Sequence, residues 1–465
     1  MTLTDLTIAE AAARIREGAL SPVDLTTAHL ERIEQLQPVL NAFITVIADH
    51  ALAAAETAQA EIGRGDYRGP LHGIPIALKD LYETRGIRTT AGSSFLAEHV
   101  PATDCAVAER LNAAGAVLLG KLNMHEWAYG ITNVNAHYGP CRNPWDTARI
   151  PGGSSGGSGA ALAAGLCMGS MGSDTRGSIR IPAALCGVAG LKPSYGRVSL
   201  RGVIPLSWNL DHAGPMARTV EDVALLLQAV AGYDPADPFA VDAPGADFLA
   251  DLDAGMAGWR VGLPVDEYFT HAAPEVLAAV DAAAQVFEGL GASVHRIDLG
   301  WLAEAGRASR VMLGADAAAF HRERLANHPE RFGPVELARL RRDSDASAAD
   351  YARLRFVQAS ATHRLGQFFE RHDLLILPAT PLPAVRIDAL GVADQDYNWT
   401  QFTAPFNMTG VPALSVPCGF TAEGLPIGLQ IVGPAWSEAL VLRAGYAYER
   451  ATDWHTRRPP LHVTP

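Results

Sequence analysis

The sequence predicts an α/β protein. Short apolar runs typical of buried strands, such as Ile74–Leu78 and Leu374–Leu377, occur along a chain that also carries amphipathic and Ala-rich segments typical of helices. With 465 residues, 48% of them hydrophobic, the chain is long enough to bury a large core. Length alone would suggest about three domains.

The N-terminal part is predicted to be mostly helical up to the first buried strand. Apolar residues share one face of a helix over 7–17, which Gly18 closes. A second helix begins at Ser21 and Pro22, where proline suits the first turn. Further predicted elements are a strand at 41–47, helices at 51–63 and 104–114, and strands at 74–78 and 116–119.

The C-terminal half contains fewer recognisable patterns. Residues 301–372 are largely helical and charged, and their arginines are expected on a solvated face. These arginines are Arg339, Arg341, Arg342 and Arg364. The other predicted elements are helices at 221–230, 274–290 and 440–450, and strands at 260–263, 294–297, 374–377, 413–417 and 426–432, the last two being neighbours.

The most unusual window is 151–193, which reads PGGSSGGSGAALAAGLCMGSMGSDTRGSIRIPAALCGVAGLKP. Two Gly/Ser turns, at 152–159 and 172–178, flank the apolar segment 160–168, and a short helix is predicted at 179–185. Glycine is used where the backbone approaches a neighbour closely or takes a positive φ. The pattern therefore predicts a site built from backbone N–H groups, with Ser hydroxyls among them.

Three other interpretations of this window exist. A flexible linker is disfavoured because the adjoining apolar segments look like packed core. A phosphate loop is disfavoured because no Lys follows the glycines and no dinucleotide fingerprint is present. Residues 152–156 literally match the nucleophile elbow G-x-S-x-G, which requires a later histidine. The pattern leaves this alternative open, because the histidines after it include His295, His321, His363 and His372.

Taken whole, the stretch closely resembles the signature of the amidase signature family: GGSSGGS, a Gly-Ser/Thr-Asp-x-x-Gly-Ser turn, then IRxPAxxCGVxGLKP. A match over about forty residues is far more specific than a short motif. Outside it, HGIPIALKD at 72–80 resembles the family's lysine motif. The segments 120–130, 138–146 and 407–433 are also similar to family segments, and only about 235–395 lacks recognisable motifs.

The resemblance implies the fold in more detail. It implies one large α/β/α domain over 1–465, with a large twisted mixed sheet flanked by helices. The signature core would comprise about 70–220 and 400–435, and about 235–395 would be a variable region on the substrate side. This expectation replaces the domain count that length alone suggests.

The resemblance also implies a catalytic triad, carried over position by position. Ser178, the last residue of the second turn, would be the nucleophile. Ser154, the third residue of GGSSGG, would be the bridging serine and would follow a cis peptide bond, and Lys79 of ALKD would be the base. The separation of 24 residues between Ser154 and Ser178 is that of the family.

The residue types suit this chemistry. A serine hydroxyl is a poor nucleophile until a base takes its proton. Lysine is such a base only when neutral, and burial disfavours its ammonium form. Because Lys79 follows a predicted buried strand, we expect it to be desolvated, although Lys79 taken alone also fits a surface lysine at a strand end. Ser154 would pass the proton from Ser178 to Lys79 and later return it to the leaving amine.

The resemblance places the oxyanion hole in the second turn, on the backbone N–H groups of Thr175, Arg176, Gly177 and Ser178. Ser178 would also stand at a helix start, where free N–H groups favour negative charge. Arg176 departs from the family, which usually has Gly at this position. Since an oxyanion hole needs only the N–H group, we expect the chemistry to survive and Arg176 to point to solvent, or else to narrow the substrate channel.

Further residues have supporting or substrate-lining roles. Asp174 is interpreted as a structural carboxylate, Ser155 as a supporting residue, and Asp211 with His212 as structural. In the family, the loop 124–140 faces the acyl side of the pocket, and the segment 391–406 is expected to cap it. The candidate lining residues, with packing as their alternative role, are Tyr129, Ile131, Thr132 and Trp208.

No metal or cofactor is predicted. His125 and Glu126 lack the HExxH arrangement, and the five cysteines form no CxxC and no metal-like pairing with His. The net charge of −13 argues against nucleic acid and against an anionic membrane surface as partners. The N-terminus does not resemble a signal peptide and no window reaches the roughly 18 apolar residues of a membrane span, so we expect the cytoplasm.

Two functions of different classes remain. The first is a stand-alone amidohydrolase that cleaves a small amide, anilide, carbamate or urea-like C–N bond through an acyl-enzyme. Its partner would be a small-molecule amide, and assembly as a homodimer stays open. The second is the amidase subunit of a tRNA-dependent amidotransferase, which releases ammonia from glutamine. Those subunits usually read IRQPA, whereas this chain reads IRIPA at 179–183, which favours the first function.

Overall fold

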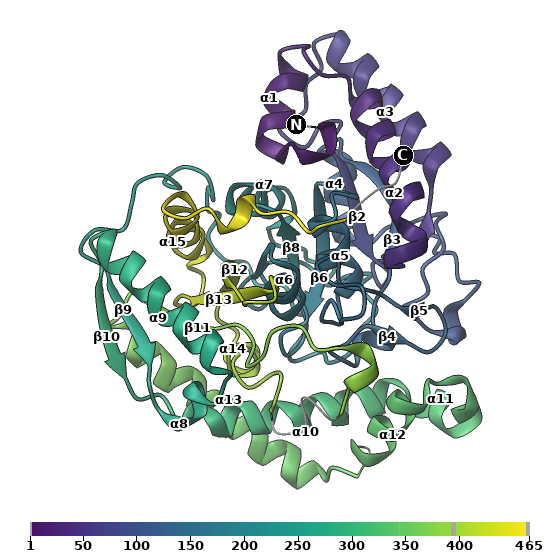
Figure 1. The fold of residues 1–465 in the computed structure, drawn as a ribbon. Helices are drawn as coiled ribbons and strands as arrows, with labels where there is room; N and C mark the ends of the chain where they lie inside the picture. Colours follow the sequence, from purple (N-terminus) through teal and green to yellow (C-terminus); the bar gives the residue numbers. More distant parts are fainter. Residues whose placement is uncertain (1, 344, 392–396, 462–465) are drawn as a thin grey trace.

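The computed structural model describes residues 2–343, 345–391 and 397–461, and within them one eleven-stranded sheet runs through the molecule (Figure 1). The strands, in their order across the sheet, are β1 (Phe43–Val46), β3 (Val117–Leu122), β2 (Pro75–Lys79), β6 (Gly169–Asp174), β8 (His212–Ala217), β7 (Ala189–Lys192), β12 (Ala413–Phe420), β13 (Pro426–Val432), β11 (Leu374–Pro378), β9 (Arg260–Pro264) and β10 (Ser293–Ile297). A separate two-stranded sheet pairs β4 (Val134–Asn135) with β5 (Gly139–Pro140).

The large sheet is mixed. Strand β2 pairs parallel with both β3 and β6, whereas β6 pairs antiparallel with β8. Strands β12 and β13, expected as neighbours, form an antiparallel pair, and β9 runs parallel to both β10 and β11. The predicted α/β class with a large mixed sheet is therefore confirmed.

Helices cover both faces of the sheet. Ile76 and Leu78 of β2 belong to an apolar cluster that includes residues of α1, α4 and α7, whereas Ala77 between them faces a second cluster with residues of α2, α3 and α5. The α-helices are α1 (Ile8–Arg16), α2 (Pro22–Leu40), α3 (Ala48–Gly63), α4 (Ala106–Ala113), α5 (Gly156–Ala163), α6 (Arg180–Cys186), α7 (Val220–Val230), α8 (Glu267–Thr270), α9 (Pro274–Gly289), α10 (Leu302–Phe320), α11 (Arg322–Asn327), α12 (Pro334–Asp343), α13 (Ala348–Phe369), α14 (Ala404–Met408) and α15 (Glu438–Arg450).

The signature region differs from its sequence interpretation in one respect. The two Gly/Ser stretches are not simply turns, because α5 begins inside the first and the second contains the end of β6. Strand β6 is buried along its whole length, and close packing explains its glycines. A Cβ on Gly169 would lie 2.8 Å from Leu226 Cδ1, and one on Gly172 would lie 2.9 Å from Ser155 Oγ. Tertiary packing thus overrides the weak strand propensity of this segment.

The segment without recognisable motifs supplies much of the remaining helical layer. Helix α10 packs against α12, α13 and α14, and α10, α12 and α13 lie along one side of the molecule (Figure 1). All five cysteines are buried and free, consistent with the prediction that Cys167 and Cys186 are core residues. Among the described residues, no helix combines the length and apolar character that crossing a bilayer requires.

Candidate active site

A cavity of about 920 Å³ lies between the turn that follows β6 and the helices α10 and α12. Thr175, Arg176 and Ser178 contribute one wall. The opposite wall comes from α10 and α12, and the segments 128–131 and 397–400 complete the lining. The second signature turn therefore opens onto a cavity that the predicted nucleophile Ser178 itself lines, as an enzyme site requires.

Lys79, the last residue of β2, is fully buried beneath this turn. Its Nζ donates hydrogen bonds to Ser154 Oγ at 2.6 Å and to Ser173 Oγ at 2.8 Å. Burial lowers the pKa of Lys79 to about 7, although the negative charges of Asp174 and Asp211 act in the opposite direction. A lysine with this pKa is neutral in a large fraction of molecules at neutral pH, and can therefore accept a proton.

Ser154 and Ser155 stand at the start of α5 and join the lysine to the second turn. The peptide bond between Gly153 and Ser154 is cis. The Ser155 N–H donates to the Ser178 carbonyl oxygen at 3.2 Å, and the Ser155 hydroxyl donates to the Ser173 carbonyl oxygen at 3.2 Å. The two serine motifs, 24 residues apart in sequence, are thereby held against each other beside Lys79.

Ser178 precedes α6 and faces the cavity. Its hydroxyl makes no hydrogen bond with any residue that the structure describes. The N–H of Gly177 donates to Asp174 Oδ1 at 2.7 Å, so this one of the four expected oxyanion donors is already occupied. The N–H groups of Arg176 and Ser178 have no partner within the described ranges, and both remain available to a negatively charged oxygen.

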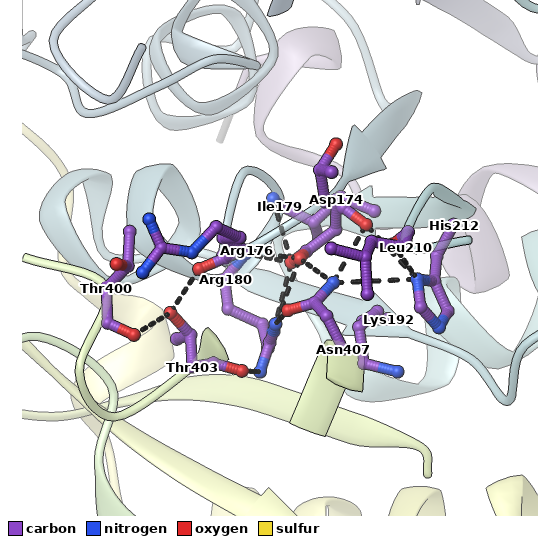
Figure 2. A network of polar contacts seen from close by, with 12 residues as sticks. Asp174, Arg176, Ile179, Arg180, Lys192, Leu210, His212, Thr400, Thr403 and Asn407 are labelled. Atoms are coloured by element: carbon purple, nitrogen blue, oxygen red, sulfur yellow. Dashed lines mark hydrogen bonds and ion pairs between the residues drawn. The ribbon is translucent and has the colours of Figure 1, made fainter. Parts of the chain in front are cut away.

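The Asp174 carboxylate holds this turn through hydrogen bonds to its backbone. Its carboxylate also accepts the Ile179 N–H and forms a fully buried ion pair with Arg180, at 2.9 Å (Figure 2). Asn407, from α14, donates to Asp174 Oδ1 at 2.8 Å and to the Asp174 carbonyl oxygen at 2.9 Å. Burial alone would raise the pKa of Asp174, but the Arg180 charge and these hydrogen bonds hold it well below its usual range. Asp174 is therefore a permanent anion that positions backbone groups.

The hydroxyl groups of Thr403 and Thr175 make further hydrogen bonds that hold the turn at 175–178 in place. Thr403 Oγ1 donates to the Arg176 carbonyl oxygen at 2.5 Å, and Thr175 Oγ1 donates to Asp211 Oδ1 at 2.7 Å. Asp211 also accepts the Leu206 N–H at 2.8 Å. Burial raises the pKa of Asp211 to about 6, and its contacts agree with a structural role.

The expectation that Arg176 points to solvent is wrong. Its Nε donates to Ser309 Oγ of α10 at 3.0 Å, and its side chain extends away from the Asp174 cluster on the side of Thr400 (Figure 2). The expectation of a solvated helix face is likewise wrong for Arg339, which is half-buried in the cavity lining, whereas Arg342 lines the cavity and is exposed as expected. In each case a helix from the variable segment folds over the signature turn, and this long-range contact is not visible in the local sequence.

The four candidate lining residues divide into two pairs. Tyr129 and Ile131 line the cavity, whereas Thr132 and Trp208 do not. The Thr132 hydroxyl accepts the Val134 N–H at 3.3 Å, and Trp208 packs edge-on against Phe320 at a centroid distance of 6.3 Å. Residues 397–400 line the cavity as part of the expected cap, while 392–396 lie outside the described residues.

Three positioning residues escaped prediction from the sequence: Ser173, Thr403 and Asn407. Ser173 bonds Lys79 from within β6, and its only local signal is its place one residue before Asp174. Asn407 begins the family-like segment 407–433, which was recognised without a role for its first residue. Thr403 stands in a segment without a motif, so its contact with Arg176 depends wholly on the fold.

Alternative site chemistries find no support in the geometry. Among the described residues, no group of three or more His, Cys, Asp or Glu side chains is placed to hold a metal ion. His125 instead bonds Glu336 of α12 through Nε2 at 2.6 Å. The elbow alternative required a histidine as the base of its serine, but the titratable side chain that contacts the Ser154 hydroxyl is that of Lys79.

Comparison with known proteins identifies the family to which this chain belongs. The model of the amidase family matches residues 24–442. The chain belongs to the amidase signature family. It is 40% identical to a glutamyl-tRNA(Gln) amidotransferase subunit from Geobacter sp. strain M21, over 99% of this chain and 100% of the relative. Membership of this hydrolase family makes the protein an amide-hydrolysing enzyme.

Two solved structures illustrate the range of this amidase family. One, described as a vestigial protein complex that reveals the evolutionary origins of an s-triazine catabolic enzyme, has a TM-score of 0.91 and 37% identity, over 96% of this chain and 98% of the other. The other is a glutamyl-tRNA(Gln) amidotransferase subunit from Thermotoga maritima, with a TM-score of 0.83 and 32% identity, over 97% and 95% of the two chains. Proteins with differently described roles therefore resemble this chain over nearly its whole length.

The comparisons correct one prediction. Net charge was taken to exclude a nucleic-acid partner, but full-length relatives at 40–42% identity are named for a tRNA amidotransferase. The exclusion is wrong because net charge sums the whole surface, whereas a protein meets nucleic acid through a local surface or within a complex. The Ile181 argument against this class also carries less weight than identity over the full chain.

Proposed function

We propose that this amidase hydrolyses a carboxamide of a small molecule through an acyl-enzyme on Ser178, with Ser154 as the bridging serine and Lys79 as the base. The observation that carries the proposal is the hydrogen bond of 2.6 Å between Ser154 and a buried lysine whose pKa burial lowers to about 7. Removing a charge from water is costly, and this site accepts that cost where a base is needed.

The proposed reaction has two halves. Ser178 Oγ attacks the amide carbon while its proton moves to Ser154, whose own proton moves to Lys79. The C–N bond then breaks, and the relayed proton goes to the leaving amine, which departs as ammonia or an amine. In the second half, water loses a proton to the same relay and attacks the acyl carbon, which releases the carboxylic acid and restores Ser178.

The oxyanion formed in each half would lie against the turn that Asp174 organises. We assign the N–H groups of Arg176 and Ser178 as its donors, since both are free in the described structure, with Thr175 as a further member of this turn. The N–H of Gly177 would contribute only by leaving Asp174 Oδ1, to which it donates now.

A second candidate is the glutaminase subunit of a tRNA-dependent amidotransferase, with tRNA and other subunits as partners. Identity of 40–42% with amidotransferase subunits over at least 97% of this chain favours this setting over a stand-alone amidase. The same triad would then release ammonia from glutamine. If ammonia release from glutamine requires partner subunits, this candidate is supported. If the rate of glutamine hydrolysis with those subunits never exceeds the rate in buffer alone, the result opposes it.

Covalent labelling tests the proposal that both candidates share. A small neutral fluorophosphonate should label wild-type protein at Ser178, as mapped by peptide mass spectrometry. Ser178→Ala should abolish the label, whereas the matched control Ser347→Ala, on the exposed start of α13, should leave it intact. A label on Ser154 alone, or none on a folded protein, would contradict the assignment of the nucleophile.

A further inference from the structure

The charged lining of the cavity is strongly unequal. Of the described residues that line it, five are arginines: Arg176, Arg307, Arg310, Arg339 and Arg342. Asp343 is the single carboxylate among them. Such an excess of one charge in a partly enclosed space attracts ligands of the opposite charge.

Among the described residues, Arg342 is the one of these five arginines that forms an ion pair with a carboxylate. Asp343 is engaged by Arg342 at 2.7 Å and by the Tyr129 hydroxyl at 2.5 Å. Arg339 donates to the Tyr129 carbonyl oxygen and has the negative charge of Glu336 nearby, whereas Arg176 donates to Ser309 Oγ and to the Gly306 carbonyl oxygen. Arg310 makes no hydrogen bond or ion pair in the part of the chain that the structure describes.

Arg176 and Arg310 line the same cavity and lie near each other, because the Arg176 side chain bonds Ser309 and Gly306 of α10, the helix that carries Arg310. Arg176 precedes Ser178 by two residues, and Arg310 projects from α10. Burial, assisted by the nearby positive charge of Arg310, lowers the pKa of Arg176 to about 10, so Arg176 stays cationic at neutral pH. Two like charges held together oppose each other unless an anion joins them.

Resting on the proposed function, we propose that the substrate is an anionic amide, whose carboxylate is bound by Arg176 and Arg310 while its amide carbon lies at Ser178. A guanidinium binds a carboxylate through two parallel hydrogen bonds, which fixes orientation as well as charge. Apolar residues between the charged groups, including Ile131, Leu206 and Val311, would contact the carbon chain.

The same lining disfavours a substrate that also carries an ammonium group. An ammonium ion is repelled by the surrounding arginines, and Asp343, the one carboxylate among the described lining residues, already accepts from Arg342 and Tyr129. Carboxylate-bearing amides without an ammonium group should therefore bind better than glutamine. This distinction separates the inference from the amidotransferase candidate.

Matched amides test the inference. Glutaramate, pentanamide and glutamine share a five-carbon chain and a terminal carboxamide, but are an anion, a neutral molecule and a zwitterion. We expect glutaramate to protect Ser178 from the neutral fluorophosphonate at about tenfold lower concentration than either, the advantage expected of one charge-assisted contact. Because the cavity does not specify chain length, the same comparison is made for malonamate, succinamate and adipamate, each against its neutral amide.

Variants locate the effect. Arg310→Gln and Arg176→Gln should each reduce the ratio of anionic to neutral affinity several-fold, and thermal unfolding shows that they fold. Arg353→Gln removes one exposed arginine from α13 outside the cavity lining and should keep the wild-type ratio. A ratio lost equally in Arg353→Gln would reflect overall charge and would overturn the assignment to Arg176 and Arg310.

The outcomes separate the two levels of the proposal. If Ser178 is not labelled in wild-type protein, the proposed function fails and the inference falls with it. If Ser178 is labelled but no anionic amide protects better than its neutral counterpart, the inference alone is wrong. Stronger protection by glutamine than by glutaramate would also overturn it and would favour the amidotransferase candidate.

Discussion

The two walls of the cavity are built on different principles. On the signature side, Lys79, Asp174 and Arg180 are fully buried and each contacts a partner at hydrogen-bond distance. On the side of α10 and α12, Arg310 and Arg342 are exposed, and the ion pair of Arg342 with Asp343 is between neighbours on one helix end. The buried charges of the first wall are paired within the protein, whereas the second wall retains charge that a ligand can use.

From this difference we expect substrate specificity to depend mainly on the side of α10 and α12. A buried, fully bonded network keeps catalytic groups in place before substrate arrives and changes little among substrates. Exposed arginines on α10 and α12 take little part in the packing of the protein, so we expect them to be free to change with the substrate. Two buried cations on the signature wall also differ from each other. Arg180 forms an ion pair with the buried carboxylate of Asp174, whereas burial lowers the pKa of Lys79 and so disfavours its charged form.

The largest expected effect is on Lys79. Lys79→Met should lower kcat for an amide substrate by on the order of 10²–10⁴-fold, because the general base is lost. Steady-state ammonia release measures this. If this variant kept nearly wild-type turnover, Lys79 would not be the general base.

The same variant should gain stability. A lysine with a pKa near 7 in the folded state and near 10.5 when unfolded binds fewer protons after folding between these values, so this group opposes folding fully below about pH 7, and the penalty shrinks as the pH rises to about 10.5. Lys79→Met should therefore raise the free energy of unfolding at neutral pH by about 1–2 kcal/mol. Denaturant titration at two pH values would show the gain fading as the pH rises; a loss of stability would contradict the interpretation.

The next effect is on the buried pair. Arg180→Met leaves Asp174 as an uncompensated buried anion, and should lower the free energy of unfolding by about 3–5 kcal/mol. It should also lower kcat, because Asp174 organises the turn. Denaturant unfolding with activity measured in parallel is the test, and unchanged stability would show that Asp174 finds another partner.

The pH dependence should reflect the lysine. The active form has neutral Lys79, so kcat/KM should be maximal above about pH 7 and fall about tenfold per unit once the pH lies well below it. Asp211, whose pKa is about 6, is the competing explanation. If the fall persists in Asp211→Asn, Lys79 is responsible; a flat profile from about pH 5 to about pH 9 would exclude a lysine base.

The smallest effect is on the opposite wall. Arg342→Gln breaks an ion pair whose arginine side chain is 52% exposed, so the free energy of unfolding should change by at most about 1 kcal/mol. Measured beside Arg180→Met under the same conditions, it compares the two walls directly. Equal losses in the two variants would mean that the walls do not differ as described.

Much of this protein was determined by its sequence alone. The long signature match identified the family, and the apolar run before Lys79 correctly predicted a buried strand, because burial on both faces of a parallel strand leaves a continuous hydrophobic pattern. Helix starts such as Thr7 and Pro22 were readable for a similar reason, since capping depends on adjacent residues. The triad Lys79, Ser154 and Ser178 follows from motif positions and stays a proposal until labelled.

Tertiary structure decided the rest. The Gly- and Ser-rich β6 became a central strand because α5 and α7 leave no room for larger side chains, not because of any strand preference. Arg176 faces the cavity because α10 covers it, and Thr403 and Asn407 reach the turn from more than 220 residues away. Such contacts depend on how distant helices pack against the sheet, and no local pattern in the sequence records that arrangement.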